Sequence, residues 1–124
     1  MQVPTVTASN LLAIIQVVRG VEVLLDEDVA VLYGIELRDV IECIAQNPDC
    51  FPDDFVFRLE EHEIAALPQP LALNGDTPRR LVFALTEHAV AFLLRWYNAD
   101  ERGVTLVEIL RGFTLYRRLL APTY

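Results

Sequence analysis

The sequence predicts an α+β domain: a small antiparallel sheet, a helix-turn-helix-like pair of short helices, and two longer C-terminal helices. Short runs that are rich in β-branched residues or alternate between apolar and polar residues predict strands at residues 11–18, 21–25, 55–59 and 80–85. Apolar residues at helical spacing predict the helices. A chain of 124 residues is long enough for one domain with one core.

The chain is expected to begin with a leader and a hairpin. Residues 1–10 contain Pro4 and several hydroxyl side chains, which favours a flexible leader ahead of a single domain over residues 11–124. The dipeptide Arg19-Gly20 separates the first two strand runs and predicts a tight hairpin turn.

The helix pair follows the hairpin. A short helix is expected to begin at Asp26 as its N-cap and to end at Gly34, which can take the positive φ of a helix end. A second helical pattern covers residues 35–45. Two short helices joined by a glycine turn form the skeleton of a helix-turn-helix, although a plain αα-corner gives the same pattern.

Turns and helices are expected to alternate in the rest of the chain. The Asn-Pro-Asp sequence at residues 47–49 stops the second helix, and residues 60–67 form one or two helical turns. Three prolines and an Asn-Gly-Asp sequence predict a loop over residues 68–78. A helix is expected over about residues 86–98, with the threonine at its start as N-cap, and a final helix over about residues 100–120.

Charge is distributed unevenly along the chain. Residues 21–63 hold thirteen acids against two arginines, net −11, whereas residues 79–124 hold seven arginines against four acids, net +3. The whole chain carries a net charge of −8. Such asymmetry bears on binding partners rather than on the fold.

Composition and motifs exclude several classes of protein. No uncharged apolar run reaches about 18 residues and no signal-peptide pattern is present, so we expect no membrane span and a cytoplasmic location. Cys43 and Cys50 could form a bridge, but reduced packing thiols are favoured. The sequence has no metal-ligand spacing, no phosphate-binding glycine loop and no nucleophile, so we expect no metal, no cofactor and no catalysis.

Three blocks of sequence form a recognisable combination. They read RGVEVLLDEDVAVLYGI at residues 19–35, NPDCFPDDFVFRL at residues 47–59, and FALTEHAVAFL at residues 83–93 with ILRGF at residues 109–113. In this order they resemble the N-terminal domain of phage antirepressor-like proteins called the ORF-six-N family, a relative of the KilA-N domain. The resemblance implies a DNA-binding regulatory domain of phages or mobile elements, acting as a transcriptional regulator or antirepressor.

The helix after the glycine turn is the candidate recognition helix, and its charge departs from the family pattern. The family tends to place basic and amide residues there, whereas this chain has Glu36, Asp39 and Glu42 around Arg38. These acids would repel DNA phosphates. The alternative function is therefore an acidic regulator or inhibitor that keeps the fold but binds a basic protein partner instead of DNA.

Arginines are the candidate DNA contacts, since cations supply most of the affinity for phosphates. For the arginine of the acidic helix, an ion pair with Glu42 is the favoured alternative, and for those of the last helix a solvated face is an equal alternative. The candidates are Arg38, Arg79, Arg80, Arg111, Arg117 and Arg118.

The last helix has an apolar stripe that is wide enough to serve two surfaces. Burial in the domain's own core is the more frequent explanation of such a stripe, but a homodimer interface would account for its width. The candidate interface residues are Val107, Leu110, Phe113 and Leu119.

Overall fold

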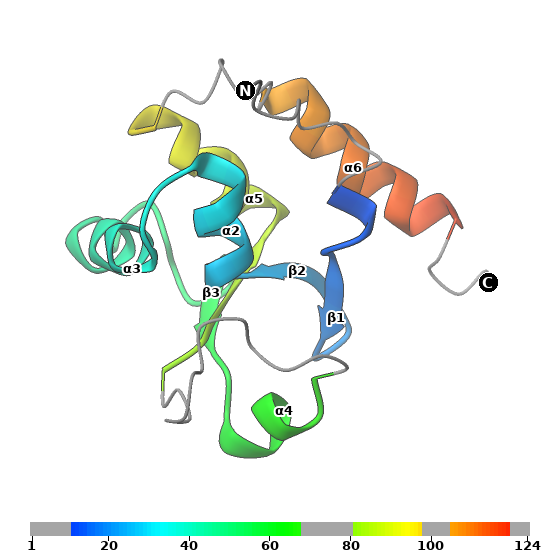
Figure 1. The fold of residues 1–124 in the computed structure, drawn as a ribbon, viewed down its shortest axis with the longest axis horizontal. Coiled ribbons are helices and arrows are strands. Elements are labelled where there is room, and N and C mark those ends of the chain that lie inside the picture. Colours follow the sequence, from blue (N-terminus) through cyan, green and yellow to red (C-terminus); the bar gives the residue numbers. More distant parts are fainter. Residues whose placement is uncertain (1–10, 68–80, 98–104, 120–124) are drawn as a thin grey trace, which may run out of the picture.

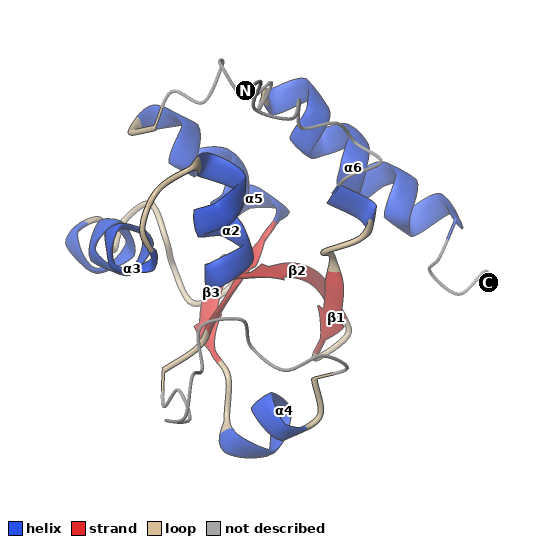
Figure 2. Ribbon diagram, viewed as in Figure 1, coloured by secondary structure: helices blue, strands red, loops and turns tan. Residues whose placement is uncertain are grey.

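The computed structural model describes residues 11–67, 81–97 and 105–119. Over these ranges the chain folds into one four-stranded antiparallel sheet and five α-helices, which confirms the α+β class. Four of these helices, α2, α3, α5 and α6, lie on one side of the sheet, and α4 lies on the other (Figure 1, Figure 2). The predicted leader and the loop over residues 68–78 lie outside the described residues.

The sheet brings together strands that are far apart in the sequence. The order across the sheet is β1-β2-β4-β3, and every neighbouring pair is antiparallel. The central pair joins β2 to β4, so the first third of the chain is hydrogen-bonded to residues about sixty positions later. The strands are β1 (Gln16–Val18), β2 (Val21–Leu25), β3 (Val56–Arg58) and β4 (Phe83–Thr86).

The hairpin between β1 and β2 forms as predicted. Arg19 and Gly20 both have positive φ, 55° and 76°, as in the tight turn that matches the twist of a two-stranded ribbon. The first predicted strand is wrong in its first half, because Leu11 begins a helical turn instead, with its carbonyl accepting from the amides of Ile14 and Ile15. Leu11 is fully buried, and core packing replaces strand propensity here.

The predicted helix pair is present as α2 (Asp26–Tyr33) and α3 (Leu37–Gln46). Gly34 ends α2 with φ 69°, as expected. The N-cap of α2 is Leu25 rather than Asp26, because Asp26 already has a helical position and its carboxylate serves another strand.

Hydrogen bonds hold α2 at both of its ends. The fully buried carboxylate of Asp26 accepts from the backbone N–H of Glu27 at 2.8 Å and from that of Phe83 on β4 at 3.1 Å. At the other end the Tyr33 hydroxyl donates to the carbonyl oxygen of Val90 on α5 at 2.6 Å. The Asp26–Phe83 and Tyr33–Val90 hydrogen bonds each span 57 residues of sequence, so they fix α2 against β4 and α5.

Apolar residues cover both faces of the sheet, because side chains of a strand alternate between faces. Leu24 of β2 and Leu85 of β4 belong to the main core with α2, α3, α5 and α6. Val23 and Ala84, their neighbours in the strands, belong to a smaller cluster that includes Ile64 of α4 (Glu61–Ala65).

The prediction of two longer C-terminal helices is wrong: only α6 (Leu106–Leu119) is long. The other consists of the short α5 (Glu87–Phe92) and the 3₁₀-helix η1 (Leu93–Arg95). It ends early because the rings of Trp96 and Tyr97 turn toward Phe51 and Tyr33 of the helix-pair region, at centroid distances of 5.7 and 6.5 Å. Tertiary packing thus overrides the helical pattern.

Three smaller predictions can be checked against the described residues. Thr86 does occupy the N-cap position of α5, but its hydroxyl is buried and makes no hydrogen bond there. Cys43 and Cys50 are free thiols, and burial raises the pKa of Cys43. No helix in the described ranges is long and apolar enough to cross a membrane.

We predict that Gly34→Val destabilises the fold. A β-branched residue at φ 69° is strained, at a cost on the order of 1–3 kcal/mol. The matched control is Ala45→Val at an exposed position of α3, where the cost is about 0.5 kcal/mol. Chemical denaturation measures both free energies of unfolding; equal losses in the two variants would contradict the assignment of the turn.

Candidate functional site

Helix α3 presents one face to the core and one to solvent. Val40 and Cys43 are buried against the domain, and the Tyr97 hydroxyl donates to the carbonyl oxygen of Asp39 at 3.4 Å. The exposed positions include Glu36, Arg38 and Glu42. The helix that follows the glycine turn therefore has its charged side exposed to solvent.

The start of α3 is stabilised by its own acids. Glu36 is the N-cap, and it forms a capping box with Asp39, whose carboxylate accepts from the Glu36 backbone N–H at 3.2 Å. This arrangement satisfies two amide groups that the first helical turn would leave unpaired. Asp39 is thus a structural acid, whereas Glu42 is exposed.

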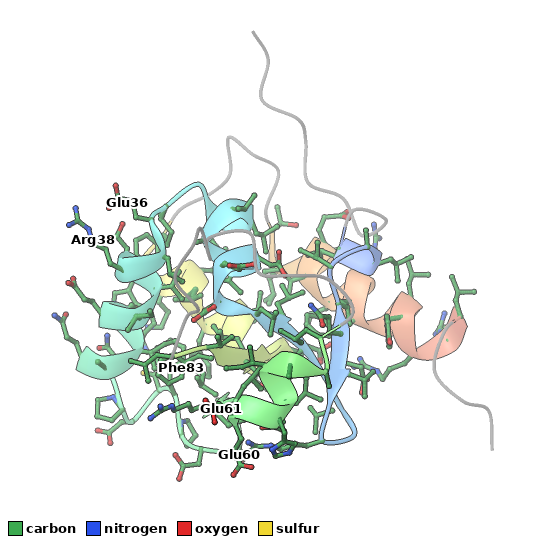
Figure 3. The ribbon with its side chains drawn as sticks, turned by 60° about the horizontal axis from the view of Figure 1, so that its bottom comes forward. Glu36, Arg38, Glu60, Glu61 and Phe83 are labelled. Carbon is green, nitrogen blue, oxygen red and sulfur yellow. The ribbon has the colours of Figure 1, made fainter. Side chains whose placement is uncertain are left out.

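Arg38, the only cation of α3, is paired with an acid. Its Nε lies 2.7 Å from Oε2 of Glu36, rather than next to Glu42 as the sequence suggested. The two side chains are 76% and 67% exposed and project together from the beginning of the helix (Figure 3). We define the acidic α3 face as Glu36, Asp39 and Glu42 with this paired arginine.

Arg117 links α6 to two other elements. Its guanidinium lies 3.1 Å from Glu87 at the start of α5 and 3.4 Å from Glu22 on β2. Since both partners are distant in sequence and all three groups are partly shielded, this candidate DNA contact is engaged in holding α6 against the sheet. It is the least available of the predicted arginines within the described residues.

Arg111 and Arg118 lie together on the outer side of α6. Arg111 is 68% exposed and has only a loose ion pair with Glu108, at 3.6 Å. Arg118 is exposed and makes no ion pair among the described residues. Helix α6 and helix α3 lie on opposite sides of the molecule, so these two arginines do not join Arg38 in one surface (Figure 1).

Arg79 and Arg80 lie outside the described residues. Of the four candidate interface residues, Phe113 is fully buried in the core of its own chain, so it is not available for an interface. The other three are exposed: Val107 54%, Leu110 41% and Leu119 66%. The width of the apolar stripe thus reflects one inner face and one outer face of α6.

Sequence reasoning did not find the ion pair that holds α4. Arg19 donates from Nε and Nη2 to the two carboxylate oxygens of Glu63, at 2.8 and 2.7 Å, and its guanidinium lies over the ring of Phe57. The bidentate guanidinium lowers the pKa of Glu63 to about 2. The partners are 44 residues apart and no local pattern connects them.

Comparison with known protein families gives a match over most of the chain. The family model described as the ORF6N domain matches residues 13–95, two thirds of the chain. No curated protein and no solved structure matches. The matched region contains the sheet, the helix pair and α5, but not α6.

The first turn of α2 contains an unusual acid. Asp28 is half-buried, and this burial, reinforced by the charges of Glu27 and Asp26, raises its pKa from 3.8 to about 6. The folded chain therefore keeps a proton on Asp28 at pH values where the unfolded chain has lost it. Consequently this carboxyl makes the fold less stable as the pH rises from 3.8 to about 6.

We predict that Asp28→Asn is more stable than the original chain at pH 7 and that this advantage disappears below pH 3.8. The measurement is the free energy of unfolding in urea across this pH range. Asp54→Asn, a substitution of an exposed acid, is the control. An advantage of Asp28→Asn that is the same at every pH would show that the charge of Asp28 is not its cause.

Proposed function

We propose a regulatory role for this chain, which belongs to the ORF6N domain family, a phage and KilA-N-related group that is not enzymatic. In this role the helix pair binds a basic surface of another protein through the acidic α3 face. The family match supports the regulatory class, and the charge of α3 supports the kind of partner.

The observation that carries the proposal is the state of the helix in the recognition position. Its single arginine is 2.7 Å from Glu36, so it offers little net positive charge, while Glu42 remains exposed. A phosphate backbone approaching this helix would meet carboxylates and release few counterions. A surface rich in arginine or lysine would instead meet opposite charge.

An acidic helix suits a partner that itself binds nucleic acid. Complementary charge steers two proteins together and aligns them, even where each exposed ion pair adds little free energy. A repressor or nuclease has a basic surface for DNA, and occupation of that surface would prevent DNA binding. This is the action of an antirepressor or inhibitor.

DNA binding by this chain itself is the second candidate. Two observations favour it: α2 and α3 are joined by a tight glycine turn, as in a helix-turn-helix, and Arg111 and Arg118 are exposed on one side of α6. In this case α6 rather than α3 supplies the phosphate contacts. The chain would then regulate transcription directly.

We predict that Glu36→Gln/Glu42→Gln weakens binding to a fluorescent arginine-rich peptide by roughly tenfold at low salt, since it removes two charges from the contact face. Glu60→Gln/Glu61→Gln is the matched control. This control removes two negative charges at α4, and one of the two residues, Glu60, is the N-cap of a capping box, as Glu36 is in α3. In both double variants the Gln side chain at the N-cap can still accept the capping hydrogen bond. Fluorescence anisotropy measures the dissociation constants.

Random duplex DNA in the same assay separates the two candidates. Equal weakening by both double variants would show that the peptide senses only net charge, and the α3 proposal would fail. Salt-dependent DNA binding that disappears in Arg111→Glu/Arg118→Glu would establish the second candidate instead. Circular dichroism confirms that each variant is folded.

A further inference from the structure

We infer that the outer side of α6 is a second, separate binding surface. It binds an amphipathic helix of a partner protein, and this helix has acidic residues beside the apolar residues that enter the groove. This inference does not depend on the proposed role of α3, because the two helices lie on opposite sides of the molecule (Figure 1).

The inner side of α6 is fully used by the core. Ile109, Gly112 and Phe113 are buried, and the N-terminal segment packs so closely that a Cβ at Gly112 would lie 2.7 Å from Cδ1 of Leu11. The helix therefore has a fixed position at the edge of the domain. Its outer apolar residues Val107 and Leu110 are not part of this core and remain 54% and 41% exposed.

The outer side of α6 forms an apolar groove of about 420 Å³. Its residues recur at intervals of three and four, so the groove follows the helix axis for about 17 Å. Leucine and valine side chains that remain about half exposed there mark a binding surface rather than a solvated one. The groove is lined by Val107, Leu110, Arg111, Thr114, Leu115 and Arg118.

The two arginines beside the groove favour a partner helix with negative charge. Arg111 and Arg118 are seven residues apart on the groove side, whereas Glu108 is the only acid in the whole of α6 and is only 27% exposed. A helix that places leucines in the groove and glutamates at its border would pair with both guanidinium groups. Helix-in-groove binding of this kind is a common mode of peptide recognition.

A second copy of this chain fits the groove less well. Symmetric pairing of α6 with α6 would bring two copies of Arg111 and two of Arg118 together, with only two copies of Glu108 to balance them. Burying this excess of positive charge opposes the gain from apolar contact. The expected homodimer is therefore less favourable here than an acidic partner.

The test uses the full chain and two designed helical peptides, which share leucines at helical spacing and differ only in bearing glutamates or lysines at the flanking positions. Isothermal titration calorimetry measures their binding. We expect the glutamate peptide to bind, and the lysine peptide to bind at least roughly tenfold more weakly.

Two variants of the groove test its two kinds of contact. Arg111→Glu/Arg118→Glu and Leu110→Ser should each weaken binding of the glutamate peptide by roughly tenfold or more. The controls are Arg38→Glu, which reverses an exposed arginine on the opposite side, and Val31→Ser, which removes an apolar side chain that is 70% exposed on α2. Both controls should bind as the unchanged chain does.

Four results would overturn the inference. The first is equal binding of both peptides, and the second is loss of binding in the controls as well as in the groove variants. The third is a stable dimer in sedimentation that Leu110→Ser dissociates, because a second copy would then occupy the groove. Binding of duplex DNA that depends on the arginines but not on Leu110 would assign the arginines to phosphate contact and would also contradict the inference.

Discussion

The attachment of α2 at both ends is the constraint on which the other elements depend. Asp26 joins the start of the helix to the backbone of β4, and Tyr33 joins its end to the backbone of α5. Both acceptor and donor are buried, and a buried polar group without its partner costs about 1–3 kcal/mol, so neither end can separate cheaply. Because β2 runs directly into α2 and β4 directly into α5, these two bonds and the β2–β4 pairing fix two β–α units side by side.

This arrangement explains how α3 can present an acidic side without harm to the fold. Gly34 ends α2, and Val40 and Cys43 of α3 are buried in the core, so the inner residues of α3 hold it against the domain. The capping box between Glu36 and Asp39 even gives two of the acids a structural role. Arg38 and Glu42 lie outside this packing, so the charge at these exposed positions can vary without loss of the core, and fold and binding preference can be considered separately.

The sequence was sufficient where the structural cause is local. The Arg19-Gly20 turn, the end of α2 at Gly34 and the stop after α3 each depend on the backbone preferences of one or two residues, and all three were predicted. It was insufficient where the cause is a distant contact. The Asp26 carboxylate accepts from the backbone of β4, Arg117 pairs with acids on β2 and α5, and Phe113 packs in the core, which is the more frequent of its two explanations. None of these distant contacts can be identified from the residues that are adjacent in sequence. Ion pairs across more than 90 residues leave no periodic signal.

Net charge alone gives a misleading view of this chain. At −8 it should avoid every polyanion and attract any cation, yet the charge is divided between separate surfaces. Helices α3 and α6 lie on opposite sides of the molecule (Figure 1), α3 with the acidic face and α6 with the groove that Arg111 and Arg118 line. Exposed charges farther apart than the Debye length, about 8 Å at physiological salt, are largely screened from each other. Under the two proposals above, each surface attracts its own partner according to its local charge, and the domain would bring a basic and an acidic protein together.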